Sequence, residues 1–286
     1  VRFTDSDSYM DLVIKTTDHT EPLGIDKNMP ARFLLPLIDQ KAASGFVNAS
    51  LALDQARAVK DIQEQELMRK ASHLNDMAMA EITHFFKEGV TETDLAEQLK
   101  KIYRDLGADG LSFEPLFAFG SNAASGHHWP DDTRLKPGDC ILVDIGCTWE
   151  GYCSDMTRTF FYKNVTQHQQ EVYHTVLKAN EEAEKAVTPG IPLSSLDQIA
   201  RGIITDKGYG SAFTHRLGHF IGLEDHEFGD VSSASADRAV PGNIFSIEPG
   251  VYLENDMGVR VEDLVLVTDH GHEILNHFSK ELTVID

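Results

Sequence analysis

The sequence has 286 residues, of which 41% are hydrophobic and 25% charged, a composition typical of a soluble globular protein with a sizeable core. Its 25 basic and 46 acidic residues give a formal net charge of −21, and a surface this negative repels nucleic-acid phosphates and anionic lipid head groups. No apolar run approaches the roughly 18 residues of a membrane span, and residues 1–11 are too polar for a secretory signal. We therefore predict a cytoplasmic protein that binds neither nucleic acid nor membrane.

The three cysteines, Cys140, Cys147 and Cys153, lie close together in the sequence without the spacing of a CxxC motif. An odd number of cysteines argues against a disulfide framework and is consistent with a reducing compartment. We expect all three to fill small spaces in the core. A thiolate zinc site is the alternative, and the missing CxxC spacing disfavours it.

The first 56 residues lack the pattern of a complete domain. The apolar residues between Leu23 and Leu37 stand among three prolines, Pro22, Pro30 and Pro36. We predict that residues 1–56 are the C-terminal remnant of an N-terminal domain, and that residues 57–286 form the main domain.

A helical pattern begins soon after residue 57. Apolar residues recur every three or four positions between Leu67 and Phe85, which predicts a long amphipathic helix that ends by Gly89. Thr91 has the position of an N-cap for a second helix that ends near Gly107.

The rest of the chain predicts strands, then two more helices, then strands again. The predicted strands are residues 112–119, 140–145, 152–162, 244–252 and 259–268, and the predicted helices are residues 167–187 and 194–206. This order of helix, helix and strands, occurring twice, indicates an α+β fold with a topological repeat.

Four acidic residues fall on predicted buried strands, two in each half of the repeat: Asp144, Asp155, Glu248 and Glu262. A buried carboxylate costs several kcal/mol unless it is paired or bound to a metal. Because four like charges in one core would repel one another, we predict that one or two divalent cations lie between them. The alternative is that each acid pairs with a nearby Arg or Lys.

Four segments around these acids resemble the prolidase and aminopeptidase P family of dinuclear metallopeptidases, and in particular the bacterial Xaa-Pro dipeptidases. They are DIGCTWEGYCSD (residues 144–155), HRLGHFIGLEDHE (215–227), SIEPGVY (246–252) and GVRVEDLVLVT (258–268). The resemblance extends from about residue 57 to the C-terminus. It implies the pita-bread fold, with residues 57–286 as the catalytic domain.

The resemblance also implies roles for individual residues. The implied metal ligands are Asp144, Asp155, His219, Glu248 and Glu262, with Asp155 and Glu262 each contacting both ions. The other implied active-site residues are His127, His215, His226 and Arg260, and Glu248 has a second role as a catalytic base. His128 is expected to be structural.

The residue types suit the chemistry that the resemblance implies. Two ions about 3.5–4 Å apart bind a shared water, lower its pKa and hold the peptide carbonyl that this water attacks. Glu248 takes the proton of the water and passes it to the leaving nitrogen, while His127 and His226 donate to the carbonyl or oxyanion. Oxygen ligands with one imidazole favour Mn²⁺, with Co²⁺ or Zn²⁺ as alternatives.

Some positions leave alternatives open. Arg260 either clamps a ligand or the substrate carboxylate, or only neutralises the surrounding acids. His215 and His219 are four residues apart, the spacing of one helical turn. The alternative to a role at the metal site is that both lie on one helix and bind no ligand. Three residues depart from the family pattern: Gly126 replaces proline, Phe220 replaces glycine and is expected to narrow the pocket, and Asp225 replaces an apolar residue and is expected to change its polarity.

We predict hydrolysis of Xaa-Pro bonds in short proline-containing peptides, most readily dipeptides, by a homodimer. Aminopeptidase P and methionine aminopeptidase are the alternatives within the peptidases. A metal-free hydrolase like creatinase, or a pseudoenzyme that binds partners, is the alternative outside them. Both require the loss of metal ligands, and all five are present in the sequence.

Overall fold

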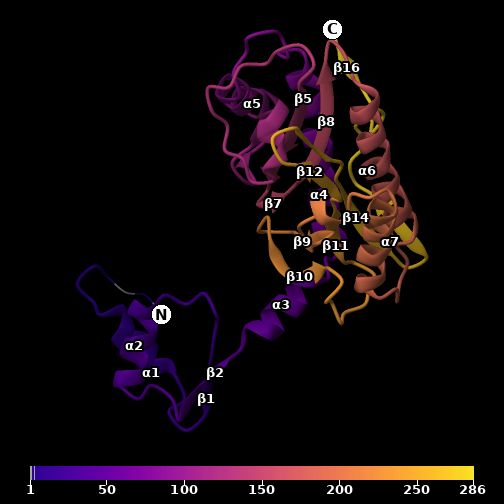
Figure 1. The fold of residues 1–286 in the computed structure, drawn as a ribbon. Helices are drawn as coiled ribbons and strands as arrows, with labels where there is room; N and C mark the ends of the chain where they lie inside the picture. The colour runs from indigo at the N-terminus through magenta and orange to yellow at the C-terminus, as the bar shows by residue number, and fades with distance from the viewer. Residues whose placement is uncertain (1, 3) are drawn as a thin grey trace. The chain divides into compact units, whose positions relative to one another are not determined.

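The computed structural model describes residue 2 and residues 4–286 of the chain (Figure 1). The chain divides into two compact units, Val1–Arg57 and Ala58–Asp286. Among the described residues, every helix is too short or too polar to span a membrane.

The first unit has two short helices and two parallel strands. Its elements are α1 (Tyr9–Thr16), β1 (Pro22–Ile25), α2 (Ala31–Asp39) and β2 (Gly45–Asn48), and α3 (Ser50–Ala58) spans the division between the units. Its core is a small cluster of four buried side chains, Ile14, Ile25, Leu37 and Ala42. That residues 1–56 are the remnant of a larger domain stays a prediction.

The second unit begins with two helices whose predicted caps are present. Helix α4 (Ile62–Thr83) starts with a capping box formed by Asp61 and Glu64. Helix α5 (Glu92–Leu106) starts with a capping box at Thr91 and ends at Gly107, whose φ of 82° is the left-handed conformation that favours glycine. Two further helices, α6 (Gln167–Lys185) and α7 (Leu193–Asp206), follow the first set of strands.

Two sheets form the centre of this unit. The first has the order β16-β8-β5-β4, and the second has the order β10-β9-β11-β14-β15. The strands of the first are β4 (Leu116–Phe119), β5 (Cys140–Ile145), β8 (Met156–Tyr162) and β16 (Val284–Ile285). Those of the second are β9 (Gly218–Phe220), β10 (Glu227–Val231), β11 (Ile244–Ile247), β14 (Asp263–Thr268) and β15 (Gly271–Ile274). Neighbours are antiparallel, except that β16 lies parallel to β8.

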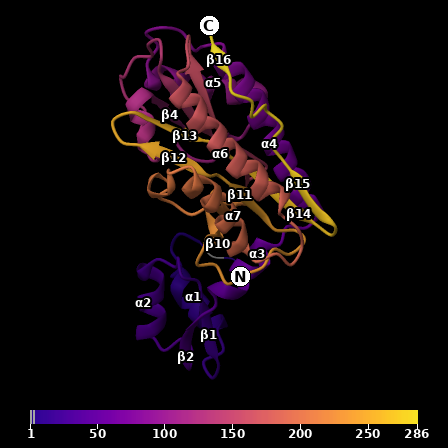
Figure 2. The ribbon, with the colours of Figure 1, turned by 45° about the vertical axis from the view of Figure 1, so that its right-hand side comes forward.

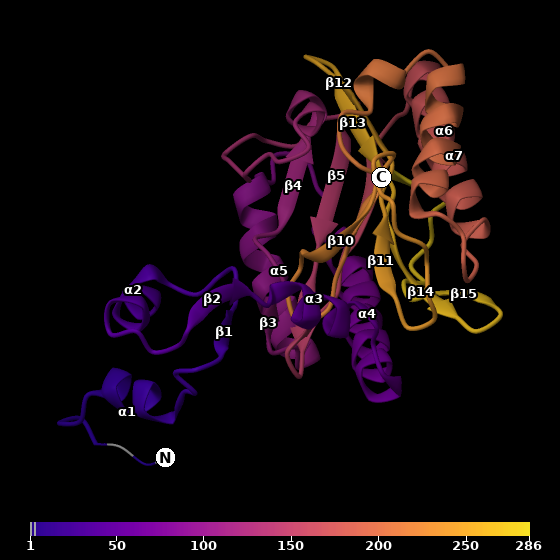
Figure 3. The same ribbon diagram turned by 90° about the horizontal axis from the view of Figure 1, so that it is seen from below.

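The repeat predicted from the sequence is present. In each sheet three strands lie in the same order, β4-β5-β8 in the first and β9-β11-β14 in the second. A hairpin interrupts each set: β6 (Cys147–Trp149) with β7 (Tyr152–Cys153), and β12 (Gly250–Leu253) with β13 (Met257–Arg260). Helices α4 and α5 pack on strands of the first half, and α6 and α7 on strands of the second (Figures 1, 2 and 3). The α+β class is therefore confirmed.

Several predicted strands are shorter than expected. The segments 152–162, 244–252 and 259–268 each contain two strands instead of one, and the segment 112–119 forms a strand only from Leu116. The breaks fall at Asp155, Glu248 and Glu262, where the chain enters or leaves a hairpin. The hairpin β9–β10 was not predicted, because its glycines and polar residues hide the alternation of a strand.

The three cysteines are free and buried, as expected of core residues. Cys140 packs in one large apolar cluster and Cys147 in another. Burial raises the pKa of the Cys140 thiol to about 12 and that of Cys147 and Cys153 to about 11, which opposes thiolate formation and metal binding.

The packing of β13 on the 3₁₀ helix Gly120–Ala124 gives a test of this fold. A Cβ at Gly258 would lie 1.8 Å from the backbone oxygen of Ala123, so we expect Gly258→Ala to lower the free energy of unfolding by about 3 kcal/mol. Gly202 is the control, because a Cβ there meets no atom within 4 Å and its helix α7 gains about 0.5–1 kcal/mol from alanine. Urea unfolding followed by circular dichroism measures both, and equal stability of the two variants would contradict this packing.

Candidate metal centre

All nine residues singled out by the resemblance line one cavity of about 570 Å³. Asp144, Asp155, His219, Glu248 and Glu262 come from both halves of the repeat, and His127, His215, His226 and Arg260 lie on the same walls. The sequence separates these side chains by up to about half of the chain, so the pairing of the two halves creates the site.

The carboxylates sit at matching places in the two halves. Asp144 lies in β5 and Glu248 directly follows β11, the equivalent strand. Asp155 directly precedes β8 and Glu262 directly precedes β14. The expectation that all four lie buried within strands is therefore wrong in part: Asp155 and Glu262 are buried, while Asp144 and Glu248 are half-buried at the cavity wall.

His219 lies in β9 with its ring between the carboxylates. Its Nδ1 lies 3.2 Å from the backbone oxygen of Phe220, which can only accept, so Nδ1 carries the proton and the lone pair of Nε2 faces the site. Nε2 is 3.4 Å from Asp155 Oδ2 and 3.6 Å from Glu248 Oε1. Burial lowers the pKa of His219 to about 3, which keeps the ring neutral and able to bind a cation.

Three residues come close enough to hold one ion together. The ligand atoms of Asp155, His219 and Glu262 all lie within 4.8 Å of one another. Burial raises the pKa of Asp155 and of Glu262 well above the usual range, and repulsion by neighbouring carboxylates adds to both shifts. Burial also raises the pKa of Glu248 to about 7. A divalent cation beside these groups stabilises their ionised forms.

Unpartnered oxygens provide the clearest fit to metal ions. Asp144 Oδ1, Asp155 Oδ1 and Glu262 Oε1 are buried, and none has a hydrogen-bond partner among the described residues. Leaving a buried polar atom without a partner costs about 1–3 kcal/mol, and more for a charged group. Asp225, which lines the same cavity, contributes a fourth such oxygen, Oδ1. Buried carboxylate oxygens gathered in this way are the arrangement that hard divalent cations compensate.

Arg260 holds two of the carboxylates through short contacts. Its Nη2 is 2.5 Å from Asp144 Oδ2, and its Nε donates to the hydroxyl of Thr157 at 2.9 Å. That hydroxyl donates to Glu262 Oε2 at 2.5 Å. Arg260 thus contacts one proposed ligand directly and a second through Thr157, and it neutralises part of the acidic charge.

His215 belongs to a directed chain of hydrogen bonds. Arg260 Nη1 donates to the Tyr252 hydroxyl at 2.7 Å, and this hydroxyl donates to His215 Nε2 at 2.9 Å. His215 Nδ1 donates to the backbone oxygen of Arg216 at 2.7 Å. Burial lowers the pKa of His215 to about 4, so the ring is neutral as this chain requires. His215 precedes β9 and His219 lies within it, so the alternative of a shared helical turn is wrong.

His226 and His127 are exposed at the cavity. The ring of His226 lies 3.8 Å from that of His219, at an interplanar angle of 31°. Arg216 Nη2 donates to His226 Nδ1 at 3.2 Å, so Nε2 carries the proton of the neutral ring and is a donor toward the site. Partial desolvation by the cavity wall and the charge of Arg216 lower the pKa of His226. His127 lies on the loop that follows the 3₁₀ helix Gly120–Ala124.

The departures from the family pattern have different outcomes. Phe220 packs against Phe245, with ring centroids 5.6 Å apart, and is buried in the core instead of lining the cavity, so the expectation that it narrows the pocket is wrong. Asp225 does line the cavity, where burial raises its pKa to about 7. A Cβ at Gly126 would lie 3.3 Å from the Tyr252 ring, so glycine leaves room for that ring.

A second group, Glu92, His128 and Asp131, also has the spacing of metal ligands. The buried carboxylate of Glu92 already accepts four hydrogen bonds, from Phe119 N, Asn122 Nδ2, His128 Nε2 and Asp131 N. Protein donors thus occupy both of its oxygens, and the group ties the loop that carries His127 to the start of α5. This contact agrees with the structural role expected for His128.

Sequence reasoning missed two residues of the site, Thr157 and Tyr252. Tyr252 ends the SIEPGVY segment, and Thr157 follows Asp155 by two residues. Their side chains act through contacts with residues about 30 to 100 positions away, such as Tyr252 with His215 and Thr157 with Glu262. The one sequence signal for Tyr252 and Thr157 was that they lie within or next to the motif segments.

Known proteins resemble this chain closely in sequence and structure. Residues 66–269 match the model of metallopeptidase family M24. A Staphylococcus aureus protein described as an uncharacterized peptidase is 41% identical over 244 residues, which cover 85% of this chain and 70% of that protein. The prolidase of Pyrococcus furiosus superposes with a TM-score of 0.92 at 31% identity, over 98% of this chain and 81% of that one. The X-Pro aminopeptidase of Thermotoga maritima gives a TM-score of 0.92 at 32% identity, over 100% and 82%.

These similarities confirm the resemblance found in the sequence and the pita-bread fold that it implies. Peptidases of the family use divalent metal ions, which agrees with the carboxylates and imidazole gathered at the cavity. From the match over most of its length, the chain is identified as a member of metallopeptidase family M24.

Proposed function

We propose that this chain hydrolyses Xaa-Pro bonds, most readily in Xaa-Pro dipeptides, with two divalent ions held by Asp144, Asp155, His219, Glu248 and Glu262. The observation that carries the proposal is the set of unpartnered carboxylate oxygens on Asp144, Asp155 and Glu262, which line one cavity together with His219. The similarity to a protein named as a prolidase and to one named as an X-Pro aminopeptidase supports the choice of bond.

The residues of the cavity have different proposed roles in hydrolysis. Bound metal ions lower the pKa of a water molecule and polarise the peptide carbonyl. Glu248 accepts the proton of the attacking water and passes it to the leaving nitrogen. His226 donates from Nε2 to the oxygen that gains charge, and His127 lies on the same cavity for a second contact. Arg260 keeps Asp144 in place and so acts on the ligand set.

The donor atoms also favour particular metals. Four carboxylates and one imidazole form a harder ligand set than the thiolates of structural zinc sites, and such sets suit Mn²⁺ or Co²⁺. We propose Mn²⁺ as the first candidate, with Co²⁺ and Zn²⁺ as alternatives. The homodimer and the cytoplasmic location stay predictions.

Aminopeptidase P activity is the second candidate function. The Thermotoga X-Pro aminopeptidase and the Pyrococcus prolidase superpose on this chain with the same TM-score, so the shared fold does not separate dipeptides from longer substrates. A metal-free hydrolase or a pseudoenzyme is disfavoured, because all five proposed ligands are present and line one cavity.

The metal ligands give the first test of the function. Asp155→Asn and Glu262→Gln each remove a charge from the carboxylate pair proposed to contact both ions, so we expect each variant to lose at least one ion and nearly all activity. Elemental analysis after gel filtration measures the metal content. Full metal content in both variants would show that these residues are not ligands.

Variants of His226 and His127 should keep their metal ions, unlike variants of the proposed ligands. His226→Ala and His127→Ala remove donors without removing a proposed ligand, so we expect turnover to fall by about 10²-fold while both ions stay bound. Steady-state kinetics at saturating Mn²⁺, together with elemental analysis, separates the two effects. Loss of metal from either variant would assign that histidine to the ligand set.

Substrate length tests the preference for dipeptides. With Mn²⁺ present, we expect kcat/KM to be higher for Xaa-Pro dipeptides than for Xaa-Pro tripeptides, and EDTA to abolish cleavage until Mn²⁺ or Co²⁺ is restored. Product analysis by mass spectrometry identifies the bond that is cut. Faster cleavage of tripeptides at the Xaa-Pro bond would favour aminopeptidase P, and cleavage after an N-terminal methionine alone would favour methionine aminopeptidase.

A further inference from the structure

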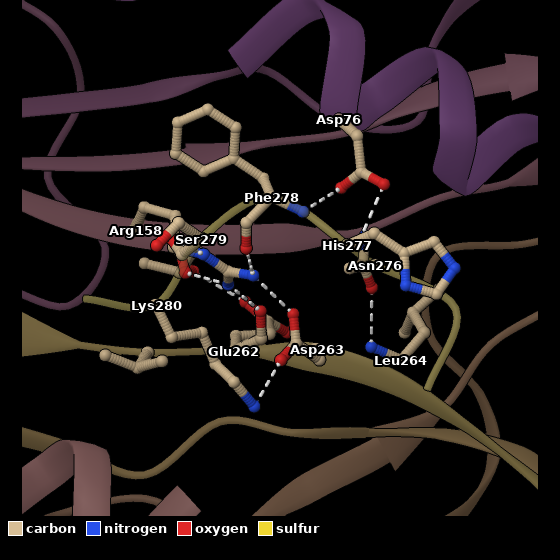
Figure 4. Close-up of polar contacts among 12 residues, drawn as sticks. Asp76, Arg158, Glu262, Asp263, Leu264, Asn276, His277, Phe278, Ser279 and Lys280 are labelled. Atoms are coloured by element: carbon tan, nitrogen blue, oxygen red, sulfur yellow. Dashed lines mark hydrogen bonds and ion pairs between the residues drawn. The ribbon is translucent and has the colours of Figure 1, made fainter. Parts of the chain in front are cut away.

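Arg158 of β8 is among the largest side chains that are fully buried in the described residues, yet it does not line the cavity. All five of its N–H donors are used. Nη1 donates to the backbone oxygens of Thr157 (2.9 Å) and Glu262 (2.6 Å), and Nη2 donates to Asp263 Oδ1 (2.6 Å) and Phe278 O (2.8 Å). Nε donates to Ser279 O at 3.2 Å. Figure 4 shows the guanidinium between Asp263 and the backbone of residues 278 and 279.

These contacts fix the backbone of Glu262 on both sides. Its N–H donates to Thr157 O at 3.1 Å, and its carbonyl oxygen accepts from Arg158. The Thr157 hydroxyl holds Oε2 of the same residue. The only oxygen of Glu262 without a partner among the described residues is Oε1, the atom that remains to bind a cation.

Segment 276–280, close to the C-terminus, provides the remaining contacts of Arg158; these contacts and those with Thr157, Glu262 and Asp263 are called the frame below. Asp76 of α4 accepts from the backbone N–H groups of His277 (2.8 Å) and Phe278 (3.0 Å). The carbonyl groups of Phe278 and Ser279 are thereby held where Arg158 reaches them (Figure 4). The segment thus connects helix α4 to the turn that carries Glu262.

Lys280 connects the same frame to helix α6. Its Nζ lies 2.9 Å from Asp263 Oδ2, 2.6 Å from Glu184 Oε2 and 2.9 Å from Asn180 Oδ1. Asn180 Nδ2 donates to Ile247 O at 2.9 Å, and Ile247 directly precedes Glu248. The frame therefore reaches the backbone beside two of the proposed ligands.

Stability alone does not explain a charged cluster at this place. Replacing a buried ion pair with apolar residues of similar volume is often neutral or stabilising, so retaining one is weak evidence for a stabilising role. A guanidinium has a planar set of five donors, which fixes the relative positions of several acceptors at once. Its acceptors here come from β8, from the turn before β14 and from the C-terminal segment.

We propose that Arg158, with Asp263 and the C-terminal segment 276–280, is a positioning assembly that holds Glu262 in the geometry for metal binding. This inference rests on the proposed role of Glu262 as a ligand. It makes the C-terminal segment part of the metal centre, although no residue of that segment lines the cavity. Contacts beyond the ligands themselves typically contribute 10–100-fold to metal affinity.

Arg158→Lys tests the proposal, with Arg69→Lys as the matched control. Lysine retains the charge but cannot reach the five acceptors together. Arg69 makes a paired contact with Glu273, both N···O distances being 2.8 Å, and has no contact with the cavity. Calorimetric titration of chelator-treated protein with Mn²⁺ measures the affinity, and thermal unfolding with and without Mn²⁺ measures the metal-induced rise in Tm.

We expect Arg158→Lys to weaken Mn²⁺ binding by 10–100-fold and to reduce the metal-induced rise in Tm, and Arg69→Lys to change neither. A purely structural role would lower Tm equally with and without Mn²⁺ and leave the affinity unchanged. That result would overturn the proposal.

Lys280→Met provides a second variant in case Arg158→Lys does not fold. It keeps the donors of Arg158 and removes the ammonium that contacts Asp263, Glu184 and Asn180, so we expect weaker Mn²⁺ binding with a smaller loss than in Arg158→Lys. Unchanged affinity in Lys280→Met, while Glu262→Gln loses Mn²⁺, would reject this assembly and leave the proposed function intact. If wild type binds none of Mn²⁺, Co²⁺ and Zn²⁺, or Glu262→Gln binds the metal as wild type does, the proposed function itself fails.

Discussion

The convergence of carboxylates at one cavity is the constraint on which the second unit depends. Asp155 and Glu262 are buried close to one another, and burial and repulsion by neighbouring carboxylates both raise their pKa values. Protein groups compensate only part of this charge: Arg260 pairs with Asp144, and Thr157 donates to Glu262. The oxygens that remain without partners point to cations as the missing compensation. Folding and metal binding are then coupled, because each removes part of the cost of the other.

The repeat explains how two halves with different sequences build one centre. Asn75 and Asn180 occupy the same position counted from the first residue of α4 and of α6, and both are fully buried. Each donates from Nδ2 to the backbone beside a proposed ligand, Ile145 O in one half and Ile247 O in the other. The first helix of each half therefore holds the backbone at the end of a strand, next to a proposed ligand.

The residues of the proposed site could be predicted from short motifs. The helices and strands around it could be predicted only in part. The periodicity and caps of α4 and α5 predicted both helices, because these signals are local in the chain. The strands were predicted too long, because the acids at Asp155, Glu248 and Glu262 lie in apolar segments that look continuous although the backbone turns there. The contact of Arg158 with Glu262 spans 104 residues, and a periodic pattern has no signal for such a contact.

Hydrogen bonds to His215, His219 and His226 indicate which ring nitrogen carries the proton in each neutral ring. His215 and His219 donate from Nδ1 to backbone oxygens, so Nε2 is left as an acceptor in both. In His215 the Tyr252 hydroxyl fills that acceptor, whereas in His219 it faces Asp155 and Glu248. In His226 the donor from Arg216 reverses the assignment and leaves Nε2 as a donor. A free lone pair can bind a cation and an N–H group can stabilise developing negative charge, so these partners are consistent with the different roles proposed for His219 and His226.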